Sequence, residues 1–141
     1  MNATNKSITV KTDVKAPVAK VWELWTVPEH IKNGNKASDD WQTTHAENDL
    51  RAGGKFTSRM EAKDGSMGFD FGGTYDEVDA MKLISYTLDD GRKVEITFAT
   101  EGDTTKITET FEAENTNSIA MQQGGWQAIL NSFKKYAESQ R

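Results

Sequence analysis

A change in the spacing of apolar residues, late in the chain, most constrains the fold. From Asp40 to Ala113 apolar and polar residues alternate, as in Lys55–Ala62, and turn signals such as Asp64-Gly65 separate the alternating runs. Alternation is typical of strands with one buried face, and tight turns between such strands indicate an antiparallel meander. The last segment instead has apolar residues at helical spacing, which predicts one helix from about Ser118 to Ser139.

The first forty residues predict a strand followed by two short helices. Residues 7–15 alternate like a strand, and Pro17 stands where the first turn of a helix tolerates proline. Pro28 ends that helix and opens a second short turn over residues 29–32. A meander with one apolar face needs a cover, and the terminal helix can provide it. We therefore expect an α+β fold, a curved antiparallel sheet of about six or seven strands wrapped around a long C-terminal helix.

Composition excludes several classes of protein. The 141 residues carry 17 basic and 22 acidic side chains without a basic stripe, so we expect no nucleic-acid partner. The chain has no cysteine, and no apolar run approaches the roughly 20 residues that span a bilayer. The N-terminal residues show no signal peptide. We expect one cytoplasmic domain over residues 1–141, with a flexible tail at 1–6, as a monomer or weak homodimer.

Large apolar side chains, many of them aromatic, fall on the predicted inward faces. One interpretation is a ligand cavity walled by aromatic rings, and the other is that the rings simply fill the core. The candidates for the cavity wall are Trp22, Trp25, Trp41, Phe56, Met60, Phe69, Phe71, Tyr75, Tyr86, Phe98, Trp126, Leu130 and Phe133.

Three polar residues are candidates for the same cavity. Asp70 and Glu109 interrupt otherwise apolar or neutral strands, and His45 could project from the second strand as a proton donor or acceptor. A carboxylate facing a cavity is a candidate for acid–base work, but without strand register either one could equally face water. Two histidines are too few for a metal site, and no serine or threonine has a recognisable base partner. We predict no catalytic residue, metal site or cofactor.

Three glycine pairs need an explanation. Gly53-Gly54 and Gly72-Gly73 lack the spacing of phosphate loops, so we interpret them as turns or bulges. Gly124-Gly125 falls in the C-terminal helical segment, where each glycine costs about 1 kcal/mol relative to alanine. Either the helix begins at Gly125, which we favour, or it approaches the sheet or a ligand closely there.

Five short motifs follow one another in order along nearly the whole chain. They are Ala16-Pro17 with Val21-Trp22, Thr26-Val27-Pro28-Glu29-His30-Ile31, Asp49-Leu50-Arg51-Ala52-Gly53-Gly54-Lys55-Phe56, Gly73-Thr74-Tyr75-Asp76-Glu77-Val78 and Gln122-Gln123-Gly124-Gly125-Trp126. With these motifs the chain resembles the START-like (SRPBCC) superfamily with its helix-grip fold. More narrowly, it is similar to the branch named for the heat-shock-protein-90 ATPase activator. The chain departs from that pattern at Ala52, where proline is usual, and at Asn33-Gly34-Asn35, where an aromatic pair is often found.

The resemblance implies a cavity between the sheet and the last helix that takes an apolar small molecule or lipid. Our leading expectation is therefore non-catalytic binding of such a molecule. The resemblance also implies an alternative, a module that interacts with a chaperone. A second alternative is a START-like enzyme such as a cyclase, hydrolase or dehydratase, in which Asp70, Glu109, His45 and Tyr75 would be the groups to mutate.

Overall fold

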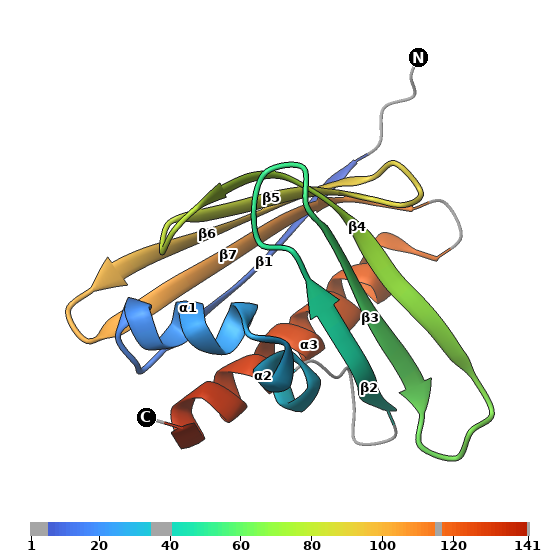
Figure 1. Ribbon diagram of the computed structural model, residues 1–141, viewed down its shortest axis with the longest axis horizontal. Helices are drawn as coiled ribbons and strands as arrows, with labels where there is room; N and C mark the ends of the chain where they lie inside the picture. Colours follow the sequence, from blue (N-terminus) through green and yellow to red (C-terminus); the bar gives the residue numbers. More distant parts are fainter. Residues whose placement is uncertain (1–5, 35–40, 115–116, 141) are drawn as a thin grey trace.

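A seven-stranded antiparallel sheet curls around one long helix, which confirms the predicted α+β helix-grip fold (Figure 1). The computed structural model describes residues 6–34, 41–114 and 117–140. The strands lie side by side in the order β1-β7-β6-β5-β4-β3-β2. Their bounds are β1 (Ser7–Val14), β2 (Trp41–Asn48), β3 (Lys55–Ala62), β4 (Gly68–Asp79), β5 (Leu83–Leu88), β6 (Lys93–Glu101) and β7 (Thr104–Glu112). The helices are α1 (Val18–Thr26), α2 (Pro28–Gly34) and α3 (Ile119–Gln140).

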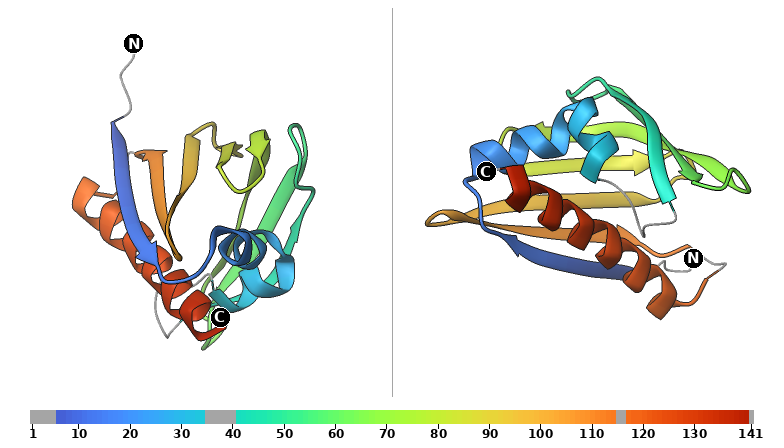
Figure 2. Two further views of the ribbon diagram at one scale, coloured as in Figure 1. Left: turned by 90° about the vertical axis from the view of Figure 1, so that its left-hand side faces the viewer. Right: turned by 90° about the horizontal axis from the view of Figure 1, so that it is seen from below.

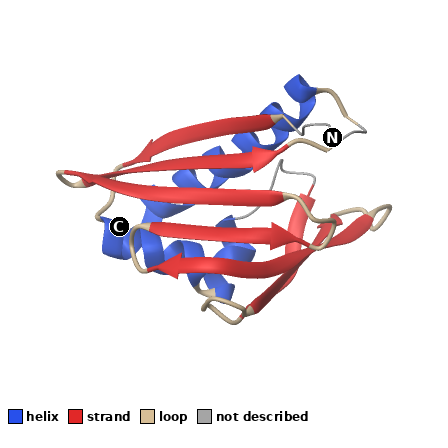
Figure 3. Cartoon of the chain, turned by 90° about the horizontal axis from the view of Figure 1, so that it is seen from above, coloured by secondary structure: helices blue, strands red, loops and turns tan. Residues whose placement is uncertain are grey.

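The helices all cover one face of the sheet, the concave one (Figures 2 and 3). The two short helices follow β1 as predicted, with Pro17 at the N-cap of α1 and Pro28 opening α2. The second helix runs beyond the expected turn, to Gly34, and Asn35, the last residue of the segment that departs from the family pattern, lies outside the described residues. Most of the predicted tail also lies outside them, and its last residue, Lys6, accepts a hydrogen bond from the backbone of Ala113.

The glycine pair of α3 lies inside the helix, so the favoured start at Gly125 was wrong. The helix begins at Ile119 because the Ser118 hydroxyl accepts a hydrogen bond from the backbone N–H of Met121, at 3.1 Å, and caps the first turn. Close approach of the helix to the sheet, one half of the alternative, is also wrong, whereas close approach to a ligand at Gly125, which borders the cavity, stays a prediction. A Cβ added at Gly124 or at Gly125 would meet no atom within 4 Å outside the helix's own backbone.

The other two pairs differ from each other. Gly53 lies in the turn between β2 and β3 with φ of +86°, which confirms the predicted turn. Gly72 and Gly73 are correctly excluded as a phosphate loop but form neither turn nor bulge: both lie within β4. A Cβ at Gly73 would come within 2.3 Å of the Thr87 carbonyl oxygen, so glycine is required by close approach of the neighbouring strand.

One polar side of α3 is fixed along β1, an edge strand of the sheet. Side chains on four turns of the helix bond to the backbone of alternate β1 residues and of Lys15 just beyond. These bonds satisfy backbone groups that an edge strand would leave open to another chain. They are Gln123 Nε2 to Thr9 O, Gln127 Nε2 to Lys11 O, Lys134 Nζ to Asp13 O and Lys15 N to Glu138 Oε2.

Below the C-terminal half of α3 the core is tightly filled. Val14, Val21, Leu130 and Ala137 are fully buried there. The buried Thr105 hydroxyl donates a hydrogen bond to the carbonyl of Ala16, at 2.8 Å, and joins β7 to the segment leading into α1. This end of the molecule therefore holds α1 and α3 against the sheet and leaves a space further along the helix.

Candidate functional site

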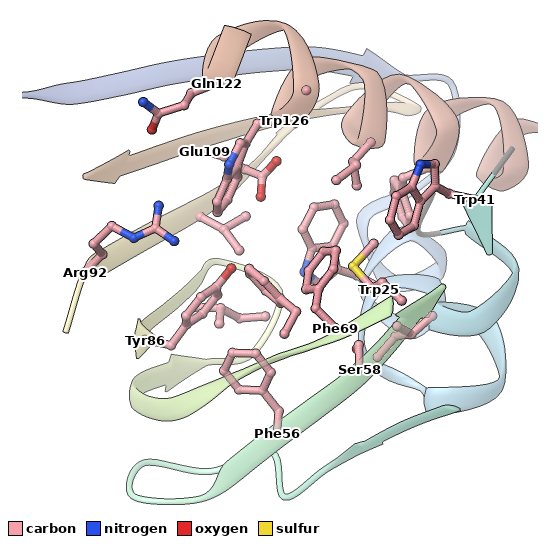
Figure 4. A pocket seen from close by; sticks show the side chains of 18 of the residues that line it. Trp25, Trp41, Phe56, Ser58, Phe69, Tyr86, Arg92, Glu109, Gln122 and Trp126 are labelled. Carbon is pink, nitrogen blue, oxygen red and sulfur yellow. The ribbon is translucent and has the colours of Figure 1, made fainter. Parts of the chain in front are cut away.

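A cavity of about 500 Å³ lies between the concave face of the sheet and the three helices (Figure 4). Its volume lies within the usual range for small-molecule sites, which are mostly apolar with a few polar groups. Its wall includes ten of the apolar side chains singled out from the sequence, namely Trp25, Trp41, Phe56, Met60, Phe69, Phe71, Tyr75, Tyr86, Trp126 and Phe133.

Three of the apolar candidates lie elsewhere. Trp22 and Phe98 pack edge to face against each other, with ring centroids 5.3 Å apart, and Leu130 is fully buried. All three face inward as predicted, but α1 lies against this end of the sheet and fills the space that they would otherwise border.

The aromatic rings of the cavity wall hold each other in place. Phe56 contacts Tyr86 edge to face with ring centroids 4.7 Å apart, and a tilted contact joins Phe56 to Tyr75 at 5.0 Å. On the opposite wall Trp126 of α3 stacks on Phe111 of β7, with centroids 3.9 Å apart and planes 11° apart. Such pairs add about 0.5–1.5 kcal/mol beyond area burial, so the wall is built largely from mutually supported rings.

His45 and Asp70 do not face the cavity, and the strand register explains why. Arg59 pairs with both in the sheet, with His45 on β2 and with Asp70 on β4. Residues directly opposite each other share a face, so both candidates lie on the outer face with Arg59. The side chain of His45 is 62% exposed and that of Asp70 is 65% exposed, and an Asp70 oxygen lies 3.5 Å from an Arg59 nitrogen.

Glu109 does face the cavity. It lies on the buried face of β7 between Ile107 and Phe111 and is 6% exposed. Its carboxyl makes no hydrogen bond or ion pair with any residue in the described part of the chain. Burial raises the pKa of this carboxyl to about 8, because the charged form loses its hydration. At neutral pH the group is therefore mainly an uncharged O–H donor.

The two tyrosines of the wall differ in their hydroxyl partners. Asn48 donates to the Tyr75 hydroxyl at 3.3 Å and to the Thr26 carbonyl at 2.8 Å, which ties β2 to β4 and α1. The Tyr86 hydroxyl has no hydrogen-bond partner among the described residues, although Tyr86 is only 7% exposed. Burial raises the pKa of Tyr86 well above its usual value, and the nearby Glu109 carboxylate adds to that effect.

Several cavity residues escaped prediction. Three of them belong to α3. Gln122 lies four residues before Trp126 and Ile129 three residues after it, and this helical spacing was a usable signal. Gly125 immediately precedes Trp126. Arg92 gave no signal, because it follows a turn glycine and its placement depends on how β5 and β6 meet. Gln122 is structural, since its amide bonds to backbone groups of Glu114 and Asn117.

The arrangement offers little to a metal ion. No group of three or more histidine, aspartate or glutamate side chains in the described ranges could hold one. Within those same ranges, no helix is both long and apolar enough to cross a bilayer. Glu109, Tyr86 and Arg92 line the cavity at one end, and the rest of the wall is mainly apolar, with further polar side chains from Thr26, His30, Ser58, Tyr75, Glu114, Asn117 and Gln122.

A curled antiparallel sheet gripping a C-terminal helix, with an apolar cavity between them, defines a START-like protein. Residues 15–138 match the profile of the family described as activator of Hsp90 ATPase homolog 1-like protein, and the chain belongs to this family. A search of curated proteins finds no match.

Solved structures agree with this assignment. The chain is 44% identical to an AHSA1-like protein from Aeromonas hydrophila, with a TM-score of 0.90 over 96% of this chain and 94% of that one. It is 55% identical to a protein from Cytophaga hutchinsonii, with a TM-score of 0.81 over 95% and 93% of the two chains. A protein from Nitrosomonas europaea, 19% identical, shares the fold with a TM-score of 0.80 over 95% of each chain.

Proposed function

We propose that the protein binds a small, largely apolar molecule in the cavity between the sheet and α3, without converting it chemically. The observation that carries the proposal is the cavity of about 500 Å³ with its aromatic wall, to which α1, α3 and the sheet all contribute. A wall of mutually packed rings is preformed, so a ligand would lose little affinity to ordering the site.

Fluorescence tests this proposal directly. Trp25, Trp41 and Trp126 line the cavity, so a bound molecule changes their emission. The probe is N-phenyl-1-naphthylamine, which is neutral, apolar and fluorescent when removed from water. We expect saturable binding that raises the melting temperature, because a ligand of the native state stabilises it. Saturation must occur at one probe per chain for the proposal to stand.

Adjacent glycines of α3 provide a matched pair of variants. Gly125 borders the cavity, whereas Gly124 is exposed and does not. Gly125→Leu places a side chain in the cavity and is expected to weaken probe binding at least tenfold. Gly124→Leu improves the same helix without entering the cavity and should leave binding unchanged. Equal binding by both variants would exclude the cavity as the site.

Association with a chaperone is the second candidate, supported by the name of the family to which the chain belongs. It calls for an apolar surface outside the cavity. Of the six large exposed apolar side chains among the described residues, Phe69 and Met121 border the cavity, whereas Val27, Met67, Met81 and Ile119 do not. Copurification with Hsp90 and stimulation of its ATPase would support this candidate, and the absence of both at micromolar concentrations would exclude it.

An enzymatic function has less support. Of the four groups that a START-like enzyme would have used, His45 and Asp70 lie on the outer face, which leaves Glu109 and Tyr75 at the cavity. We further propose that the protein acts in the cytoplasm as a monomer or weak homodimer. Cell fractionation and size-exclusion chromatography with light scattering test these two statements.

A further inference from the structure

Three polar side chains meet at one end of the cavity, and each comes from a different part of the sheet. Glu109 belongs to β7, Tyr86 to β5, and Arg92 to the turn that leads into β6. Figure 4 shows them on one side, whereas Trp41 and Phe69 lie on the other. After burial, the first cause of its raised pKa, the Tyr86 hydroxyl is influenced by Glu109, which raises that pKa further when ionised, and by Arg92, which lowers it, so the three groups lie in one neighbourhood.

Two of these groups lack partners within the described part of the chain. The Glu109 carboxyl and the Tyr86 hydroxyl are both more than nine-tenths buried, and neither forms a hydrogen bond there. Buried polar groups are nearly always hydrogen-bonded, because leaving one without a partner costs about 1–3 kcal/mol. Leaving these two groups without partners therefore lowers the stability of the folded state, and a ligand that forms the missing hydrogen bonds offsets this loss.

Arg92 is held in position and still has donors to offer. Asp90 fixes it from two sides, with Arg92 Nε 2.8 Å and the Arg92 backbone nitrogen 3.1 Å from the carboxylate oxygens. No described residue accepts a hydrogen bond from its two terminal nitrogens, and the side chain is 20% exposed. A guanidinium held in this way presents a planar pair of donors that matches a carboxylate.

The three groups together favour a ligand group that accepts hydrogen bonds. Arg92 and Tyr86 both donate, and Glu109 donates as well when it is uncharged, the form that burial favours by raising its pKa. A hydrocarbon end would leave all three unsatisfied. An amine would pair with Glu109 but would meet the positive charge of Arg92. A carboxylate satisfies the donors and balances that charge.

We propose that the cavity binds an amphipathic carboxylic acid, with its carboxylate hydrogen-bonded by Arg92 and Tyr86 beside Glu109 and its apolar part among the aromatic rings. This inference rests on the proposed function, since it specifies the ligand class of the same cavity. The apolar part would lie between Phe56, Phe71 and Trp126, since the Phe56 ring contacts Tyr86 and the Phe71 ring contacts both Phe56 and Trp126.

Three probes with the same tail test the head group: decanoate, 1-decanol and decylamine, each titrated by calorimetry below its micelle concentration. We expect decanoate to bind at least tenfold more tightly than decanol, and decylamine to bind most weakly. The protein carries a net charge of −5, so nonspecific attraction would favour the amine instead. A preference for decanoate must then come from the cavity.

Arg51 provides a matched control for Arg92. Its Nε also lies 2.8 Å from an aspartate two residues earlier, Asp49, but its side chain is 72% exposed and does not border the cavity. Arg92→Met is expected to weaken decanoate binding at least tenfold and decanol binding less than threefold, whereas Arg51→Met should change neither. Tyr86→Phe removes one donor and should weaken decanoate severalfold, which keeps the test open if Arg92→Met fails to fold.

The outcomes separate this inference from the function on which it rests. Equal affinities for the three probes, or tightest binding of decylamine, would overturn the carboxylate site while leaving the apolar cavity in place. Loss of decanoate binding in Arg51→Met as large as in Arg92→Met would overturn it as well. If neither decanoate nor N-phenyl-1-naphthylamine binds, the proposed function and the inference both fail.

Discussion

The two ends of the space beneath α3 are built from similar residues yet differ in how they are filled. Toward the C-terminal end of the helix, Leu130 and Ala137 have no exposed surface, like Val14 of β1 and Val21 of α1, and of the buried residues in this half of α3 only Phe133 borders the cavity. Toward its N-terminal end, rings such as Phe71 and Trp126 border a cavity. The difference is that α1 lies against the first end. An inward-facing aromatic residue therefore becomes core or cavity wall according to what packs opposite it.

The largest effect is expected from Glu109, the buried carboxyl at the polar end of the cavity. Its pKa in the folded protein is about 8 against a normal value of 4.5, so the folded state binds more protons between these values. Stability should therefore fall as pH rises from about 4.5 through 8, by at most about 5 kcal/mol, and then level off. Glu109→Gln should remove this slope, as urea unfolding at pH 5 and pH 9 would show. The same slope in both proteins would mean that the carboxyl reaches water.

The next prediction compares two neighbours on α3. Leu130 is fully buried at the packed end, whereas Ile129 borders the cavity and is only half-buried. Leu130→Ala should lower the free energy of unfolding by about 3 kcal/mol, because it removes contacts and leaves a void in a filled core. Ile129→Ala should cost about 1 kcal/mol, since its contacts are fewer. Chemical denaturation measures both, and equal losses would contradict the distinction between the two ends.

A smaller gain in stability is expected from the glycines of α3. Alanine at Gly124 or at Gly125 should each stabilise the protein by about 1 kcal/mol, because helix propensity improves and the added Cβ meets no other atom within 4 Å. Melting temperatures would show the gain. A loss of stability on Gly125→Ala alone would indicate that the helix approaches the sheet there, and that the cavity is narrower than described.

The smallest effect concerns how α3 is fixed along β1 at its two ends. Lys134 Nζ lies 2.6 Å from the Asp13 carbonyl at the packed end, whereas Gln123 Nε2 lies 3.4 Å from the Thr9 carbonyl at the cavity end. Lys134→Met should cost about 0.5–1 kcal/mol, because it removes the hydrogen bond to Asp13 together with the part-exposed ion pair to Glu138, and Gln123→Met less. Hydrogen exchange of the α3 amides would show which end loosens. A larger loss from Gln123→Met would mean that the cavity end is the better anchored one.

The sequence by itself determined the order and type of the elements. Period-two alternation and turn glycines located the meander, and the spacing of Trp126, Leu130 and Phe133 located the terminal helix. These signals are local, since they depend on residues a few positions apart, and they suffice for fold class. They also put Glu109 on the same strand face as Ile107 and Phe111, but whether its carboxyl faced the cavity or water was left open until the structure placed it in the cavity wall.

Only the tertiary structure decided which inward residues border the cavity and which polar groups join them. Asp70 and His45 turn outward because each lies opposite Arg59, and register between strands is not encoded in either strand alone. Arg92 borders the cavity because of how the turn between β5 and β6 is placed. Phe98 belongs to the core because α1 packs over it. Such placements depend on contacts between segments that are distant in the sequence, and a local sequence pattern does not determine those contacts.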